Sequence, residues 1–118
     1  MLHKKLNYSF HDATLISAEM EKEDRLLIHL RLDGMTYPDH DPLSLTFSGI
    51  LNAGEVKDYF RAIESYAHQP GWHGTRIDDL DYAPDRISKT LDLYLILALD
   101  GYPPLVIHCK KLRITSEH

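Results

Sequence analysis

The fold is decided by residues 91–99, which read LDLYLILAL and carry a leucine at every second position. Successive side chains of a strand point to opposite faces, so this stretch predicts a strand with one continuous leucine face. Its other face is also mostly apolar, with Tyr94, Ile96 and Ala98, which is typical of a central strand covered on both sides. Residues 26–32, LLIHLRL, alternate in the same way and predict a second strand.

Each of these two strands is followed by a similar run of residues. The dipeptides Asp33-Gly34 and Asp100-Gly101 tolerate the positive φ of tight turns, and in both places a Pro-Leu pair then opens another alternating stretch. These stretches, 43–48 and 105–110, predict two further strands. Aligning them matches Leu43 with Leu105, Leu45 with Ile107, Phe47 with Cys109 and Ile50 with Leu112.

A third candidate strand precedes each pair, at 16–20 in the first half and at 77–82 in the second. The chain therefore reads as two similar three-stranded meanders, which cover about 14–50 and about 75–114. One interpretation is an internal duplication. The other is that any two antiparallel hairpins share alternation and turn residues, and the sequence leaves both interpretations open.

One helix is predicted between the two halves, over about 53–67. Asn52 followed by Glu55 is the arrangement of a capping box, and Pro70-Gly71 ends the helix. Its apolar face consists of Val56, Phe60, Ile63 and Ala67. We predict an α+β fold, predominantly antiparallel β, in the order βββ-α-βββ, with the helix packed on the sheet. Whether the strands form one sheet or a sandwich stays open.

Length and composition bound the class of protein. At 118 residues the chain fits one domain, 1–118, and no apolar run approaches the roughly 20 residues that span a bilayer. We expect no membrane association and, because the N-terminus lacks the apolar stretch of a signal peptide, no export. The only cysteine is Cys109, which excludes an internal disulfide and favours the cytoplasm. The formal charge of −5 repels phosphate backbones unless the 13 cations gather on one face, so we expect no nucleic-acid partner.

The leading catalytic candidates are His11 and Asp12, in the segment NYSFHDA before the first strand. Histidine titrates near neutral pH, and a neighbouring carboxylate can orient its ring, as a general base or a metal ligand requires. Adjacent residues of an extended chain point to opposite faces, however, so these two side chains need not touch. The alternative is a structural role at the strand entry, with Asp12 bonding backbone amides and His11 held by a buried partner.

A weaker candidate, for metal binding, is the loop that contains Asp39, His40 and Asp41. It concentrates oxygen and nitrogen ligands, but it lacks the alternating ligands, the glycine turn and the distal glutamate of a calcium loop. A solvated turn explains the same residues, because Asp and Pro are common in turns. The chain also contains no Gly-rich phosphate loop, no His-Glu-x-x-His and no Gly-x-Ser-x-Gly, so we expect no cofactor.

Two sets of residues are candidates for binding a partner. Trp72 and His73 sit between glycines after the helix, where the tryptophan could anchor a partner or close one end of the core. Asp78, Asp79, Asp81 and Asp85 form a negative strip that could recognise a basic partner or protect a sheet edge. Both sets point to another protein as the partner.

The segments Phe10-His11-Asp12-Ala13 and Leu45-Thr46-Phe47-Ser48-Gly49-Ile50 carry a resemblance. With a hairpin after the first segment, the chain resembles small uncharacterised bacterial domains, including immunity-type proteins of polymorphic toxin systems. Such immunity proteins bind and block a cognate toxin. The resemblance therefore implies an interaction surface and no catalytic residues.

We favour a non-enzymatic protein-binding or inhibitory module as the function. The first alternative is a small hydrolase or metal-dependent protein that uses His11 and Asp12, with His73 or His108 brought near by folding. The second is a homodimer whose exposed sheet edges pair, since open sheets leave backbone groups unpaired.

Overall fold

Seven strands and one helix make up the part of the chain that the structure describes. The computed structural model describes residues 9–34, 37, 42–67, 75–83 and 92–116. The elements in chain order are β1 (Thr14–Lys22), β2 (Arg25–Arg31), β3 (Pro42–Ser48), α1 (Ala53–Ala67), β4 (Thr75–Tyr82), β5 (Leu93–Leu99), β6 (Leu105–Cys109) and β7 (Lys111–Ser116). The predicted α+β fold with a mostly antiparallel sheet is confirmed, and the helix lies between the third and fourth strands.

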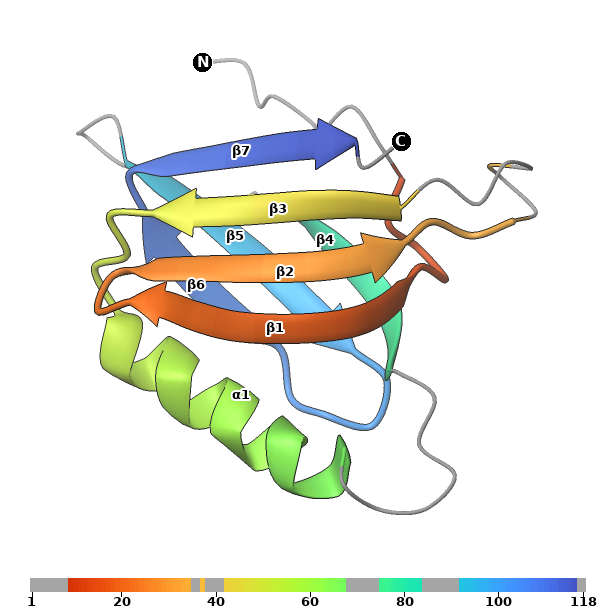
Figure 1. The fold of residues 1–118 in the computed structure, drawn as a ribbon, viewed down its shortest axis with the longest axis horizontal. Helices are drawn as coiled ribbons and strands as arrows, with labels where there is room; N and C mark the ends of the chain where they lie inside the picture. Colours follow the sequence, from red (N-terminus) through yellow and green to blue (C-terminus); the bar gives the residue numbers. More distant parts are fainter. Residues whose placement is uncertain (1–8, 35–36, 38–41, 68–74, 84–91, 117–118) are drawn as a thin grey trace.

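The strands form one antiparallel sheet that is folded into two layers. Its order is β6-β5-β4-β1-β2-β3-β7. Figure 1 shows β1, β2, β3 and β7 in the front layer, with β4, β5 and β6 running obliquely behind them. The layers are joined where Thr14 of β1 pairs with Arg76 of β4, and where β6 continues through Lys110 into β7. The chain is therefore a single sheet with the shape of a sandwich.

The core lies between the two layers and is built from the alternating apolar residues. In β2, Leu26, Ile28 and Leu30 are at most 1% exposed, and in β5 Leu95 and Leu97 are fully buried. The alternate residues of both strands are half-buried or exposed. Alternation along each strand thus separates the core from the outer surface of its layer.

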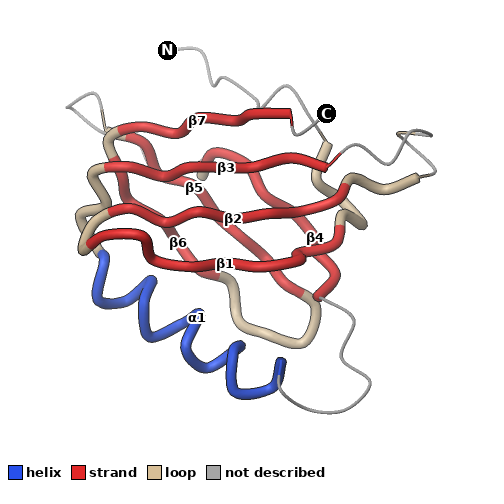
Figure 2. Tube along the Cα trace, viewed as in Figure 1, coloured by secondary structure: helices blue, strands red, loops and turns tan. Residues whose placement is uncertain are grey.

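Helix α1 closes one side of the two layers. It contacts β1 of the front layer and β6 of the back layer (Figure 2). Val56, Phe60 and Ile63 are buried, as the helical spacing predicts. The carbonyl of Asn52 accepts the first helical hydrogen bond, from Val56 N. Within the described ranges, no helix has the length and apolarity needed to cross a lipid bilayer.

The outer edge of β6 is covered by the residues that lead into α1. Leu51 N donates to the carbonyl of His108 at 2.7 Å, and Asn52 Oδ1 accepts a hydrogen bond from His108 N at 2.9 Å. Asn52 Nδ2 donates to the carbonyl of Val106 at 2.7 Å. These bonds occupy backbone groups that an open edge would offer to a second copy. The homodimer through sheet edges stays a prediction.

One strand was not predicted, so the order βββ-α-βββ lacks β7. This strand begins immediately after Lys110 and pairs with β3 from Ser48 to Leu43. Leu112 and Ile114 pack against the core, while the alternate residues are exposed. The sequence shows the same alternation on both sides of Lys110. The change of layer depends on pairing with a distant strand, which no local pattern reveals.

The second hairpins of the two meanders have the same register. In β2–β3 the buried pairs are Leu30–Leu43, Ile28–Leu45 and Leu26–Phe47. In β5–β6 the corresponding pairs are Leu97–Leu105, Leu95–Ile107 and Leu93–Cys109. Three of the four matched pairs, from Leu43–Leu105 to Phe47–Cys109, therefore occupy equivalent places in the two ladders. The fourth match is wrong, because Ile50 follows the end of β3 whereas Leu112 pairs with Phe47 inside β7.

Candidate functional site

Residues Phe10 to Ala13 form a tight turn before β1. Ala13 N donates to the carbonyl of Phe10 at 3.0 Å, and Asp12 has a φ of 65°, in the left-handed region that aspartate enters more readily than most residues. Phe10 and Ala13 are buried, whereas the side chains of His11 and Asp12 are 66% and 42% exposed. The turn therefore directs its apolar ends into the core and presents its two polar residues on the surface.

This turn is held against β4. Asp12 N donates to the carbonyl of Ile77 at 2.8 Å, and Ile77 N donates to the carbonyl of Ala13 at 2.7 Å. The two bonds extend the short pairing of β1 with β4, which joins the layers. His11 and Asp12 are thereby fixed beside β4, and their backbone has a structural role.

Arg76 of β4 gathers three carboxylates around one guanidinium. Its Nη1 lies 2.6 Å from Asp12 Oδ1, and its Nη2 lies 2.6 Å from Asp78 Oδ1 and 3.6 Å from Asp100 Oδ1. The hydrogen bond to Asp12, followed by the nearby carboxylate charges, raises the pKa of Arg76 above its ordinary value. The four side chains are 41% to 63% exposed, so water screens each pair and its contribution to stability is small. The main effect is to order the carboxylates.

His11 faces two acceptors of this cluster. Its Nδ1–H donates to the backbone carbonyl of Asp78 at 2.8 Å, and its Nε2 lies 3.5 Å from Asp12 Oδ2. The carbonyl of Asp78, and then the carboxylate of Asp12, raise the pKa of His11 above 6.5. An acceptor at each nitrogen favours the imidazolium, which has no lone pair with which to act as a general base. The turn thus brings the exposed side chains of His11 and Asp12 together, and they form an ion pair when His11 is protonated.

The predicted acidic strip lies along β4 and continues this cluster. A register irregularity next to Asp79 marks a β-bulge; Asp78 pairs with Arg76 while Asp79 is exposed. Asp81 accepts a hydrogen bond from Tyr82 N at 2.8 Å. We refer to Asp12, Asp78, Asp79, Asp81 and Asp100 together as the acidic surface. With one arginine among these five carboxylates, the surface is negative.

A second pair of histidine and aspartate, which was not predicted, lies on the outer face of the back layer. His108 Nε2–H donates to Asp92 Oδ2 at 3.0 Å, and the ring stacks on Tyr94 with centroids 4.1 Å apart and planes at 13°. The side chains of His108 and Asp92 are only 24% and 19% exposed. Alternation along β5 and the register that places Tyr94 opposite His108 are the signals that could have found this cluster.

The structure does not bring His108 near His11. His11 belongs to the cluster that contains Asp100, which follows the end of β5, whereas His108 lies opposite Tyr94 near the start of that strand. The strand between Tyr94 and Asp100 spans about 20 Å. The two histidines are therefore parts of separate clusters, and the geometry does not support a catalytic centre that contains both.

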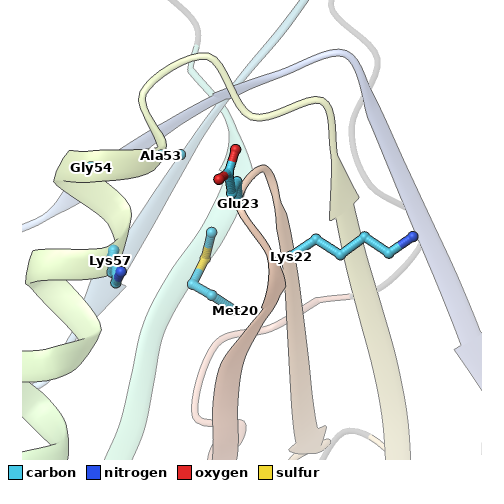
Figure 3. A pocket seen from close by; sticks show the side chains of 6 residues that line it. All are labelled: Met20, Lys22, Glu23, Ala53, Gly54 and Lys57. Carbon is cyan, nitrogen blue, oxygen red and sulfur yellow. The ribbon is translucent and has the colours of Figure 1, made fainter.

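Two of the hollows on the surface are lined by described residues, and neither of these includes His11 or Asp12. The first, of about 310 Å³, lies between the β1–β2 turn and the start of α1 and is lined by Met20, Lys22, Glu23, Ala53, Gly54 and Lys57 (Figure 3). Figure 3 shows Lys22 pointing away from the helix and from Met20. The second, of about 350 Å³, is lined by Ile16, Ser17, His29, Leu30, Arg31 and Pro42. Each hollow combines aliphatic groups with a few charged or polar ones.

Several predicted site residues lie outside the described part of the chain, namely Asp39, His40, Asp41, Trp72, His73 and Asp85. Within the described part, no three residues among His, Cys, Asp and Glu are placed to hold a metal ion. Cys109 is buried in the core, and burial raises the pKa of its thiol to about 11. A thiol with so high a pKa is not activated as a nucleophile.

The chemistry that the acidic surface can supply is recognition of cations. Carboxylates form strong, charge-assisted hydrogen bonds with the ammonium and guanidinium groups of lysine and arginine. The contacts of His11 and Asp12 orient charges, and none of them activates a nucleophile. Comparison of the chain with protein-family models, with curated proteins and with solved structures gives no match in any of the three.

Proposed function

We propose that this chain is a non-enzymatic protein-binding module of the inhibitory, immunity-like type, and that it binds a basic protein partner. The observation that carries the proposal is the acidic surface, where carboxylates from the turn before β1, from β4 and from the end of β5 surround Arg76. Complementary charge steers two proteins together and selects the partner. An inhibitor of this type acts by covering a positively charged site on the partner.

Two features of the acidic surface suit it to binding. Arg76 holds Asp12 and Asp78 at 2.6 Å, so little side-chain freedom remains to be lost when a partner docks. Asp79 is exposed and makes no ion pair with any residue in the described ranges, so its carboxylate is available to a partner cation. Asp100, at 63% exposure and 3.6 Å from Arg76, is nearly as accessible. We expect the partner to engage Asp79 and Asp100 first.

The test is capture of a partner from a native lysate by the immobilised full chain. The variant Asp79→Lys/Asp100→Lys reverses two exposed charges of the acidic surface. The matched control, Glu21→Lys/Asp58→Lys, changes the net charge equally at exposed positions on β1 and α1. We expect the wild-type chain and the control to retain a basic protein that salt elutes, and the acidic-surface variant to lose it.

Two outcomes would contradict this function. Capture of no protein by the wild-type chain at any salt concentration would remove the binding module itself. Equal capture of the same protein by all three chains would show that the acidic surface is not the contact. Circular dichroism of both variants checks that each remains folded.

We infer further that the two meanders are copies of one unit and that the chain works in the cytoplasm. The equal registers of β2–β3 and β5–β6 support the first inference, and the single cysteine supports the second. If matched positions are equivalent, the exchange Leu45→Ile/Ile107→Leu conserves volume at each site and should cost less than about 1.5 kcal/mol. Loss of cooperative unfolding in the exchange variant would contradict the equivalence.

A further inference from the structure

The outer face of the front layer is covered by no element that the structure describes. This face is turned toward the viewer in Figure 1, whereas α1 lies below β1 in that view and contacts both β1 and β6. In β2 and β3 every second residue is buried in the core, and the residues between them point to this outer face. In β7 Leu112 and Ile114 pack against the core, so the residues on either side of each point to the outer face. A sheet face of four strands is therefore presented to solvent.

Five cations lie on this face, and we refer to them as the basic face: Lys22, Arg25, Arg31, Lys111 and Arg113. Lys22 and Arg25 are cross-strand partners, and Lys111 and Arg113 pair with Ser48 and Thr46 of β3. None of the five makes an ion pair with another described residue, in contrast to Arg76 with its three carboxylates. The register places one carboxylate, that of Glu19, on the same face.

The groups between these cations are mostly hydroxyls and an imidazole: Ser17, Ser44, Thr46, Ser48, Thr115 and His29. The ring nitrogen Nδ1 of His29 lies 3.1 Å from Ser44 Oγ. Protein–protein interfaces are enriched in aromatic residues, methionine and arginine and depleted in lysine and serine. Contacts to the nucleic-acid backbone, by contrast, are made largely by arginine, lysine, serine and threonine. The composition of this face matches the second class.

We propose that the basic face binds the phosphodiester backbone of a nucleic acid without reading its sequence. The net charge of −5 predicts no such partner, but binding depends on the cations that a surface gathers, and this surface gathers five. The described residues of the face include no Phe, Tyr or Trp on which a base could stack, and the imidazole of His29 lies 3.1 Å from Ser44 Oγ. The inference uses residues other than the acidic surface and does not rest on the function proposed above.

The experiment measures fluorescence anisotropy of the full chain with a labelled single strand, a labelled duplex of the same sequence, and a labelled poly-glutamate peptide, over a series of salt concentrations. Five phosphate contacts predict a slope of log K against log salt of about −4.5 for the duplex and about −3.5 for the single strand. We expect binding of an oligonucleotide at low salt, with similar affinity for unrelated sequences. The two oligonucleotide arms show which form of the backbone the face prefers.

The variant Lys111→Glu/Arg113→Glu removes two of these contacts at exposed positions of β7. The matched control, Lys57→Glu/Arg61→Glu, changes the net charge equally on α1. We expect the β7 variant to lose at least about tenfold in affinity and about two units of salt slope, and the control to keep the wild-type slope. The proposal would be overturned by equal losses of affinity in the two variants or by absence of oligonucleotide binding at low salt. Tighter binding of poly-glutamate than of either oligonucleotide would also overturn it and would identify an acidic protein as the partner.

Discussion

The two meanders share a buried skeleton and differ in the surface that they present. Inside, the pairs of β2–β3 and β5–β6 follow the same register. On the outer surface the matched residues differ. The cross-strand pair Leu27–Thr46 of β2–β3 is replaced by Tyr94–His108 in β5–β6. Asp92 stands at the position before β5 that matches Arg25 of β2. The first meander supplies Lys22, Arg25 and Arg31 of the basic face, and β7 supplies its other two cations. The second meander carries an aromatic stack and most of the acidic surface. The inward residues maintain one architecture, and the outward ones are free to serve different partners.

The largest expected effect tests the shared buried residues at a matched position where the two meanders carry side chains of different size. Phe47 and Cys109 occupy equivalent places, and both are fully buried. Phe47→Ala should lower the free energy of unfolding by about 3–5 kcal/mol, because it removes a ring and leaves a cavity. Cys109→Ala removes one small atom and should cost about 1 kcal/mol. Urea denaturation of both variants measures the difference, and equal costs would contradict the equivalence of the two sites.

The next effect concerns how each meander covers the outer edge of its third strand. In the first meander β7 pairs with β3, whereas in the second the side chain of Asn52 bonds to Val106 and His108 of β6. Asn52→Ala removes both bonds and leaves two backbone groups unsatisfied, so it should cost about 1–3 kcal/mol. Glu55→Ala, which removes only the 3.1 Å hydrogen bond from Asn52 Nδ2 to Glu55 Oε2, is the control. Similar destabilisation by the two variants would mean that the Asn52 contacts with β6 contribute nothing.

A smaller effect is expected from the outward cluster that only the second meander has. Asp92→Ala and His108→Ala each remove one partner of the 3.0 Å contact, and together they form a double-mutant cycle. Because both groups are less than one quarter exposed, we expect a coupling of about 0.5–1 kcal/mol in urea denaturation. The matched cycle Leu27→Ala with Thr46→Ala, at the equivalent first-meander positions, should show less coupling. The reverse order would contradict a stabilising role for the Asp92–His108 pair.

The smallest effect is a pH dependence at the joint between the meanders. The folded-state pKa of His11 is raised above 6.5, so its stabilising contacts are fully present below pH 6.5 and are lost as the pH rises through the folded-state pKa. The melting temperature of His11→Gln should therefore fall below that of the wild type at acidic pH and approach it at alkaline pH. A difference that is constant or grows with pH would contradict a stabilising role for the contacts of protonated His11 with the carbonyl of Asp78 and the carboxylate of Asp12.

The local alternation of apolar and polar residues was enough to predict most of the strands. The leucines of 93–99 and every second residue of 26–32, from Leu26 to Leu32, face the core as expected, and the helix lies where its spacing places it. Leu91 lies outside the described residues. The joint at Lys110 could not be predicted, because the same alternation continues on both sides while the pairing partner changes from β5 to β3. Periodicity identifies strands, but it does not identify their neighbours.

The candidate site was predicted less completely, for the same reason. His11, Asp12 and the acidic residues of β4 were candidates, but Arg76, which holds them together, lies 64 residues from Asp12 along the chain. The expectation that His11 and Asp12 point to opposite faces assumed an extended chain, and the left-handed conformation of Asp12 replaces it with a turn. Contacts between distant segments and a single unusual backbone angle leave no periodic pattern in the sequence.

The most direct test of the central claim, that the two oppositely charged surfaces bind different partners, is a crossed retention measurement. The wild-type chain, Asp79→Lys/Asp100→Lys and Lys111→Glu/Arg113→Glu are immobilised side by side, and each is exposed to the captured basic protein and to the oligonucleotide. We predict that the first variant loses the protein and keeps the oligonucleotide, and that the second does the opposite. Loss of the same ligand by both variants would show that the two surfaces do not act separately.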